Sequence, residues 1–414
     1  MIYHNFSNQT FMRTEYESRN NRATVLKQNV TRKIEEKNNM KIGVLFGAGA
    51  EIAYDMPSGM GFAANIVFPS EKTIDLAKKD FEAFLGKPYE FMRFSSEDFQ
   101  PMFVSNIRSV FKSEEKKQHY TTEIDELGKI TVETGSDFEI LLSFLKEAIA
   151  YADSEKQEVE EHFAEFFSRL EKVKTILYDT KGNTELKITL GEKIVNLANE
   201  VFEGMIGYEQ LLMEYYSSLF SNPHEPSPEF NKTASFLFIA RAYVMSSFTP
   251  SAAKLGSYYN DIKKSIDAER IAQPAVRTNW VVATTNYSRI EKYLGFKSKE
   301  KARYLNGNVN LFLNLKNNTI LDTAKRNDKL SFKDGICVPL LYLQSTVKPF
   351  LAFELFHEYL NLYNQFKDCK FVAVIGFGFN KDDGIINSMF RKLIGSGTEV
   401  IYFQYEVSVN SSLA

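Results

Sequence analysis

Residues 47–51, Gly-Ala-Gly-Ala-Glu, bring two glycines and a carboxylate together directly after a short apolar run. That run, residues 42–46, is interrupted only by Gly43 and predicts a buried strand. Because Gly47 and Gly49 carry no side chains, a phosphate can approach the backbone closely. The start of a helix after this turn would favour negative charge. The stretch therefore predicts an anion cradle, although Gly-Ala-Gly alone is a weak signal for a nucleotide.

Three later segments, like residues 47–50, stand at the carboxyl ends of predicted parallel strands. These segments are Thr284-Thr-Asn-Tyr287, Leu305-Asn-Gly-Asn308 and Gly376-Phe-Gly-Phe379. Open α/β sheets bind ligands at the carboxyl ends of their parallel strands, so we expect all of these segments to share one site. After the last segment, Asp382 or Asp383 can either cap the next helix or hydrogen-bond a ribose.

The strands expected to position these segments are short and almost continuously apolar, as in sheets that are covered on both faces. They span residues 42–46, 280–285, 336–343, 371–375 and 400–403. Helical periodicity over 352–366 and 385–394 separates the later strands, which predicts a parallel sheet with right-handed crossovers. The first strand lies far upstream of the second, so the long helical stretch between them is interpreted as an insertion.

The predicted fold class is therefore α/β: a Rossmann-like parallel sheet with helices on both faces and a large, mainly helical insertion. We assign residues 40–70 and 276–414 to the sheet domain and residues 71–275 to the helical insertion domain. Residues 1–39 are polar and mildly basic, and are interpreted either as an extension without a role or as an oligomerisation arm.

Composition excludes several other classes of protein. A chain of 414 residues with 44% hydrophobic residues and 35 Phe is long enough for a sizeable core in two or three domains. The net charge of −3 gives no reason to expect direct nucleic-acid binding. Cys337 and Cys369 are too few for a disulfide framework or a zinc site, so we expect a cytoplasmic protein without a metal. No apolar run reaches the roughly 18 residues of a membrane span, and residues 1–39 lack the apolar block of a signal peptide.

The order of the motifs G-A-G-A, T-T-N-Y, L-x-G and G-F-G-F-x-x-D, with a helical insertion after the first, resembles the sirtuin-like domains of bacterial anti-phage defence proteins. The resemblance covers roughly residues 40–405 and is carried by order and spacing, not by one specific motif. Domains of that family are Rossmann-like and bind NAD, and many members hydrolyse NAD to nicotinamide and ADP-ribose. The resemblance therefore implies NAD or ADP-ribose as the ligand, and is consistent with a homo-oligomer or with a partner protein from a defence system.

Carried over to this sequence, the resemblance assigns the catalytic Asn of the family to Asn286. It also implies that a set of strand-end residues contacts NAD. That set is Gly47, Ala48, Gly49, Ala50, Glu51, Thr285, Gly376, Gly378 and Asp383. Two positions depart from the family pattern. Glu51 replaces a small Ser beside the expected pyrophosphate, and Asn306 stands where the L-H-G motif has its catalytic His.

The replacement at Asn306 leaves two functions open. Asn cannot take up a proton at neutral pH and so cannot act as a general base, whose loss typically costs about 10²–10⁴-fold in rate. One expectation is slow NAD hydrolysis directed by Asn286; the other is a non-catalytic NAD or ADP-ribose sensor or assembly subunit. A nicotinamide-dependent dehydrogenase is disfavoured by the lack of a clear G-x-G-x-x-G motif. Lysine deacetylation is disfavoured because two cysteines cannot form the zinc module of classical sirtuins.

Overall fold

The structure, a computed structural model, is divided into two compact units. Unit 1 contains Met1–Ser58, Ala83–Leu85 and Arg241–Ala414, and unit 2 contains Gly59–Glu82 and Gly86–Ala240. The structure describes residues 41–52, 54, 56–57, 59–130, 136–153, 156–178, 192–205, 212, 215, 217–221, 226–248, 258–272, 280–296, 302–324, 335–341, 353–379 and 383–403. The predicted N-terminal extension, residues 1–39, lies outside this set.

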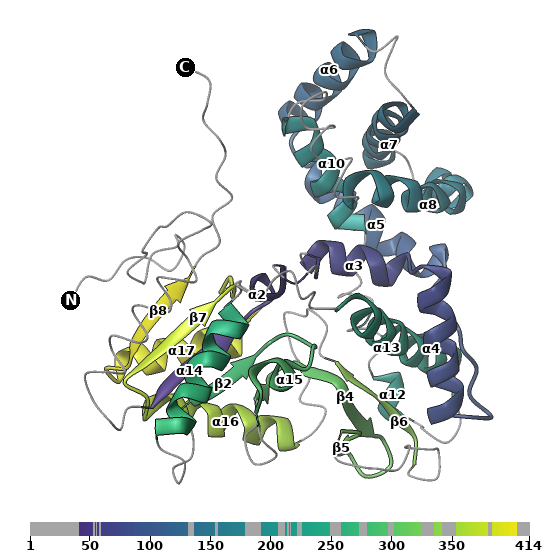
Figure 1. Cartoon of the computed structure of the whole chain (residues 1–414). Coiled ribbons are helices and arrows are strands. Elements are labelled where there is room, and N and C mark those ends of the chain that lie inside the picture. Colours follow the sequence, from purple (N-terminus) through teal and green to yellow (C-terminus); the bar gives the residue numbers. More distant parts are fainter. Residues whose placement is uncertain are drawn as a thin grey trace, which may run out of the picture. The chain divides into compact units, whose positions relative to one another are not determined.

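Unit 1 is built on a five-stranded sheet with the order β3-β2-β1-β7-β8 (Figure 1). Its strands are β1 (Ile42–Phe46), β2 (Trp280–Thr284), β3 (Arg303–Tyr304), β7 (Phe371–Ile375) and β8 (Glu399–Phe403). Every pairing among them is parallel, and β1 lies at the centre with Ile42 opposite both Trp280 and Phe371. All five residues of β1 and of β7 are buried, as expected of strands covered on both faces. This arrangement confirms the predicted α/β fold with a Rossmann-like sheet.

Helices cover both faces of this sheet. On one face, α16 (Phe353–Lys367) and α17 (Gly384–Gly395) share an apolar core with the strands, in which Phe366 and Phe390 lie with Leu45. On the other face, α14 (Tyr258–Ala272) packs the ring of Tyr259 edge-on against Phe46, with ring centroids 4.9 Å apart. The alternation of side chains along β1 therefore sends Leu45 and Phe46 into two different layers.

A second sheet in unit 1 corrects part of the prediction. It has three antiparallel strands in the order β5-β4-β6, which are β4 (Gly307–Asn314), β5 (Thr319–Asp322) and β6 (Cys337–Leu341). The expectation that residues 336–343 join the parallel sheet is wrong, because β6 pairs with β4. The β4–β5 hairpin turns at Asn317 and Asn318: Asn318 has a φ of 53°, and Oδ1 of Asn317 accepts a hydrogen bond from the backbone N–H of Thr319. Asn tolerates this left-handed conformation better than most residues.

The described residues of unit 2 form helices and no strand. These helices are α3 (Gly59–Val67), α4 (Glu71–Phe84), α5 (Ser96–Val110), α6 (Glu114–Ile130), α7 (Ser136–Asp153), α8 (Lys156–Tyr178), α10 (Glu192–Met205), α12 (Ser218–Ser221) and α13 (Pro228–Ser247). Helices α4 and α13 each continue from unit 2 into unit 1. The core of unit 2 is rich in Phe; the ring of Phe103, for example, lies 4.8 Å from that of Phe163 and 5.4 Å from that of Phe166.

The division assigns α14 to the unit that contains the sheet, whereas the predicted insertion extends to residue 275. The limits of the predicted domains stay predictions.

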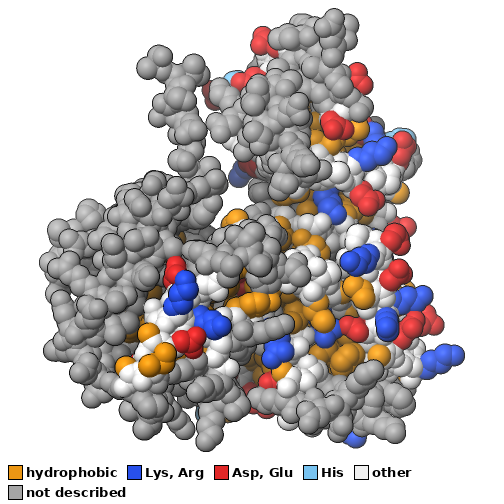
Figure 2. Space-filling view, in the orientation of Figure 1, with side chains coloured by type: hydrophobic (Ala, Val, Ile, Leu, Met, Phe, Trp, Pro, Cys, Tyr) orange, Lys and Arg blue, Asp and Glu red, His pale blue; other side chains and the backbone are white. Residues whose placement is uncertain are grey.

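None of the described helices is both long and apolar enough to cross a membrane. On the face of the molecule shown in Figure 2, acidic and basic side chains of the described residues are interspersed. This mixture agrees with the small net charge of the chain.

Candidate functional site

The loops that follow β1, β2, β3 and β7 meet at one edge of the parallel sheet. The side-chain amide of Asn286 donates from Nδ2 to the carbonyl oxygen of Gly47 at 2.9 Å. The amide of Asn306 donates in the same way to the carbonyl oxygen of Thr285 at 3.0 Å. The backbone N–H of Gly49 donates to the carbonyl oxygen of Gly376 at 2.8 Å. Four segments that are far apart in the sequence are therefore joined by direct hydrogen bonds.

The glycines of the β1 loop lie directly against the β7 loop. A Cβ atom on Gly47 would lie 2.4 Å from the Cα atom of Phe377, and one on Gly49 would lie 3.0 Å from the Cα atom of Gly376. Gly376 has a φ of 66°, and a Cβ atom there would lie 2.1 Å from the backbone nitrogen of Ala50. Close packing of the two loops is sufficient to require glycine at these positions.

Most backbone N–H groups of the β1 loop already have acceptors within the protein. Gly47 donates to the carbonyl of Ile375, Ala50 donates to that of Gly47, and Glu51 donates to that of Ala48. Ala48 is exposed, and its own N–H has no acceptor among the described residues. The helix that follows, α2 (Gly49–Ile52), has only four residues. A contact between this loop and a phosphate stays a prediction, with Ala48 as its accessible position.

The loop after β2 is fastened to the end of β1. The backbone N–H of Thr285 donates to the carbonyl of Phe46 at 2.9 Å, and the backbone N–H of Asn286 donates to Oγ1 of Thr284 at 3.0 Å. Thr284, Thr285 and Asn286 are all buried. These bonds fix the loop backbone, so the Asn286 side chain is directed at the β1 loop.

Glu51 points into the protein, where only 3% of its surface is exposed. Its carboxylate accepts hydrogen bonds from Oγ of Ser288 and from the hydroxyl of Tyr259 at 3.3 Å. Burial raises the pKa of Glu51 from 4.5 to about 7, because removal of the carboxylate from water disfavours its charge more than these hydrogen bonds favour it. The sequence-based interpretation noted Glu51 but not its partners.

Tyr259, which donates to Glu51, is itself packed among aromatic rings. Tyr54 stacks on Tyr259 with ring centroids 4.6 Å apart, and its hydroxyl oxygen accepts a hydrogen bond from the backbone N–H of Tyr259 at 3.1 Å. Tyr259 belongs to no motif, and only the packing of α14 on β1 brings it to the site. Ser288 lies two residues after Asn286, so extension of the T-T-N-Y segment by one residue would have included it.

Asn306 is held in a structural role by its surroundings. Its Nδ2 bonds the carbonyl of Thr285, while the neighbouring residue Leu305 donates to the carbonyl of Thr284 and accepts from the hydroxyl of Tyr359 at 3.0 Å. Gly307 has a φ of 80°, and a Cβ atom there would lie 1.9 Å from the carbonyl oxygen of Leu340. The backbone on both sides of Asn306 is therefore fixed.

Two other predicted positions lie near the start of α17. Gly378 is exposed. Asp383 occupies the position before the first helical residue, and its side chain makes no capping hydrogen bond; its carbonyl instead accepts from the backbone N–H of Asn387 at 2.8 Å. The capping alternative for this carboxylate is not observed. Contact with a ribose stays a prediction, and Asp382 lies outside the described residues.

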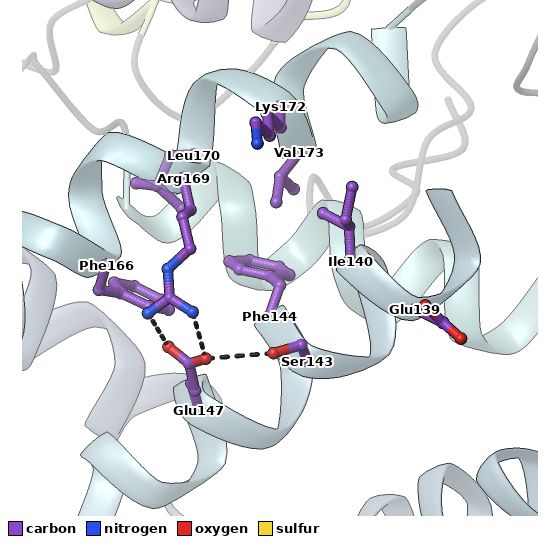
Figure 3. A pocket seen from close by; sticks show the side chains of 10 residues that line it. All are labelled: Glu139, Ile140, Ser143, Phe144, Glu147, Phe166, Arg169, Leu170, Lys172 and Val173. Atoms are coloured by element: carbon purple, nitrogen blue, oxygen red, sulfur yellow. Dashed lines mark hydrogen bonds and ion pairs between the residues drawn. The ribbon is translucent and has the colours of Figure 1, made fainter. Parts of the chain in front are cut away.

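A separate cavity of about 300 Å³ lies in unit 2 between α7 and α8 (Figure 3). Its wall includes the apolar side chains of Phe144, Phe166 and Leu170. At its rim, Arg169 forms a two-pronged ion pair with Glu147, with nitrogen–oxygen distances of 2.7 and 2.6 Å. None of the residues predicted to act at a site lines this cavity.

The described residues contain no group of three or more His, Cys, Asp or Glu side chains that could hold a metal ion. No protein-family model and no curated protein matches this sequence. The fold itself identifies an α/β protein with a Rossmann-like parallel sheet.

If the glycine loops are packed as described, Gly47→Ala should destabilise unit 1. The added Cβ atom forces the β1 and β7 loops apart, at a cost of about 1–3 kcal/mol, as for other overpacked sites. Urea unfolding followed by the fluorescence of Trp280, the single Trp of the chain, reports on this unit.

Gly395→Ala in α17 is the matched control for Gly47→Ala, since nothing lies within 4 Å of a Cβ atom there. It should be neutral or stabilise the protein by about 0.5–1 kcal/mol. Equal unfolding midpoints for Gly47→Ala and the wild type would contradict the described packing.

The raised pKa of Glu51 predicts a specific dependence of stability on pH. The folded protein holds the Glu51 proton up to about pH 7, whereas the unfolded chain releases it near pH 4.5. The bound proton therefore contributes fully to the free energy of unfolding below pH 4.5, and this contribution is lost as the pH rises to about 7. This difference in pKa corresponds to a loss on the order of 3 kcal/mol. In Glu51→Gln this contribution should be absent, so the difference in unfolding free energy between the two proteins should change over this interval.

The exposed residue Glu354 provides a matched control on α16. Glu354→Gln should leave the pH dependence of Trp280-detected unfolding almost unchanged. A Glu51→Gln profile that runs parallel to that of the wild type between pH 4.5 and 7.5 would show that Glu51 does not titrate near neutral pH.

Proposed function

We propose that this protein binds NAD and hydrolyses it slowly to nicotinamide and ADP-ribose, in the cytoplasm of a bacterium and as part of anti-phage defence. One observation carries the proposal: Gly47 and Asn286, which the sirtuin-like resemblance assigns to the phosphate loop and to catalysis, are joined by a 2.9 Å hydrogen bond although they are 239 residues apart. The proposal includes a homo-oligomer or a partner protein from a defence system, as the same resemblance implies.

The chemistry of NAD is compatible with a site that lacks a strong base. Nicotinamide is a cationic leaving group, so its bond to the ribose breaks with oxocarbenium character before much negative charge is needed on the attacking water. The protein then has to hold the ribose and orient that water. This positioning alone increases the rate of hydrolysis. An amide oxygen such as Oδ1 of Asn286 can accept a hydrogen bond from the water.

A second candidate function is a sensor or assembly subunit that binds NAD or ADP-ribose without cleaving it. Asn306 favours this alternative, because its amide donates to the carbonyl of Thr285 and cannot take up a proton. The two candidates differ in turnover and share the ligand, so one set of measurements separates them.

Asn306→His should increase the release of nicotinamide from NAD, by at most about 10²–10⁴-fold, which is the usual worth of one positioned general base. A His ring can still donate an N–H to the carbonyl of Thr285, so the loop can be retained. Asn286→Ala in the same background should suppress the gain. Free nicotinamide is measured over time, together with NAD binding by calorimetry.

Asn196→His, at an exposed position of α10, is the control for the introduction of a histidine. Binding of NAD without nicotinamide release by either the wild type or Asn306→His would favour the sensor. No heat of binding with NAD or with ADP-ribose would contradict the nucleotide proposal as a whole.

A further inference from the structure

The cavity between α7 and α8 is unusual, because protein interiors contain few empty spaces larger than a water molecule. Its volume is about 300 Å³. Its wall is built from apolar residues that recur at helical spacing, which are Ile140 and Phe144 on α7 and Phe166, Leu170 and Val173 on α8 (Figure 3). Concave sites with a mainly apolar wall are typical places for small molecules to bind.

The volume of the cavity limits the size of its ligand. An engineered apolar cavity of about 150 Å³ takes up benzene, and the cavity here has about twice that volume. It therefore has room for about two fused aromatic rings. The rings of Phe144 and Phe166 lie 6.0 Å apart between centroids, with only 13° between their planes. They offer flat apolar surfaces against which such rings pack well.

The charged groups at the rim favour a ligand without charge. Both oxygens of the Glu147 carboxylate accept from Arg169, and Oε1 also accepts from Oγ of Ser143 at 3.2 Å. Glu139 and Lys172 also line the cavity, but both are exposed and stay hydrated. A charged ligand would give up its hydration against the apolar wall, which is costly. An uncharged ligand avoids this cost.

One donor of Arg169 lacks an acceptor. Its Nε–H group is buried, and no group among the described residues accepts a hydrogen bond from it. The guanidinium lies over the ring of Phe166, with Cζ 5.9 Å from the ring centroid, so this donor is held beside the apolar wall. A buried donor without an acceptor is destabilising. A ligand atom with a lone pair would satisfy it.

We propose that the cavity between α7 and α8 binds an uncharged two-ring heteroaromatic compound, with its rings against Phe144 and Phe166 and a ring nitrogen that accepts a hydrogen bond from Nε of Arg169. The free purine bases belong to this chemical class. The inference does not depend on the proposed NAD function, because none of the residues assigned to NAD lines this cavity.

Quinoline and naphthalene are a matched pair of probes, since both have two fused rings and only quinoline has a ring nitrogen. Each is titrated into the full chain labelled with ¹³C in the δ1 methyl groups of isoleucine, and the Ile140 signal is identified as the one absent from Ile140→Val. Quinoline should shift this signal and bind about 10-fold more tightly than naphthalene, because a hydrogen bond from a charged donor contributes at least about this factor. An unchanged Ile140 signal, or equal affinities for the two probes, would overturn the proposal.

The variant Arg169→Lys keeps a cation for Glu147 and removes the Nε donor. In this variant quinoline should lose its advantage of about 10-fold, whereas naphthalene should bind as it does to the wild type. Retention of the quinoline preference in Arg169→Lys would overturn the assigned hydrogen bond.

A second variant, Ile140→Phe, places an additional ring at the cavity and should weaken the binding of both probes by about 10-fold or more. Leu76→Phe, at an exposed position of α4, is the matched control and should leave both affinities unchanged. Circular dichroism checks that each variant keeps the helix content of the wild type. Undiminished quinoline binding by a folded Ile140→Phe would show that the probe binds elsewhere and would overturn the proposal.

Discussion

The strand-end loops of this protein are organised around one buried carboxyl group. Removing a carboxylate from water is costly unless hydrogen bonds replace the lost solvation. Glu51 receives these bonds from Ser288, which follows β2, and from Tyr259 of α14. The carboxyl group therefore joins three segments that are distant in the sequence, and each of its donors must be in position for Glu51 to be accommodated.

The elements packed around β1 hold the donors to Glu51 in position. Because β1 is the central strand, its carboxyl end lies between the β2 loop and the β7 loop. Tight contact of Gly47 and Gly49 with the β7 loop fixes one side, and the hydrogen bond from Asn286 to Gly47 fixes the other. Phe46 anchors Tyr259, which closes the cluster from the second face of the sheet. The packing of the loops and of Tyr259 against β1 therefore determines which polar groups reach Glu51.

The sequence predicted the elements whose signal is local. Strand β7 matches its expected limits and α16 and α17 lie within one residue of theirs, because apolar runs and helical spacing mark them directly. Strand β6 was assigned to the wrong sheet, because five buried residues look alike in a parallel and in an antiparallel strand. The contact of Glu51 with Tyr259 joins positions 208 residues apart and depends on how α14 packs, for which no local pattern exists. Both glycine motifs were recognised and expected at one site, but the direct packing of one glycine loop against the other was not foreseen.

The environment of Glu51 also bears on whether it can replace the missing histidine. A general base must come within hydrogen-bond reach of the proton that it removes, directly or through one water. Glu51 is 3% exposed and its carboxylate already accepts hydrogen bonds from two side chains, so substrate has no direct access to it in this structure. Under the proposed function, Glu51 would therefore not replace the base that is lost at Asn306, and this loss would limit the rate of hydrolysis.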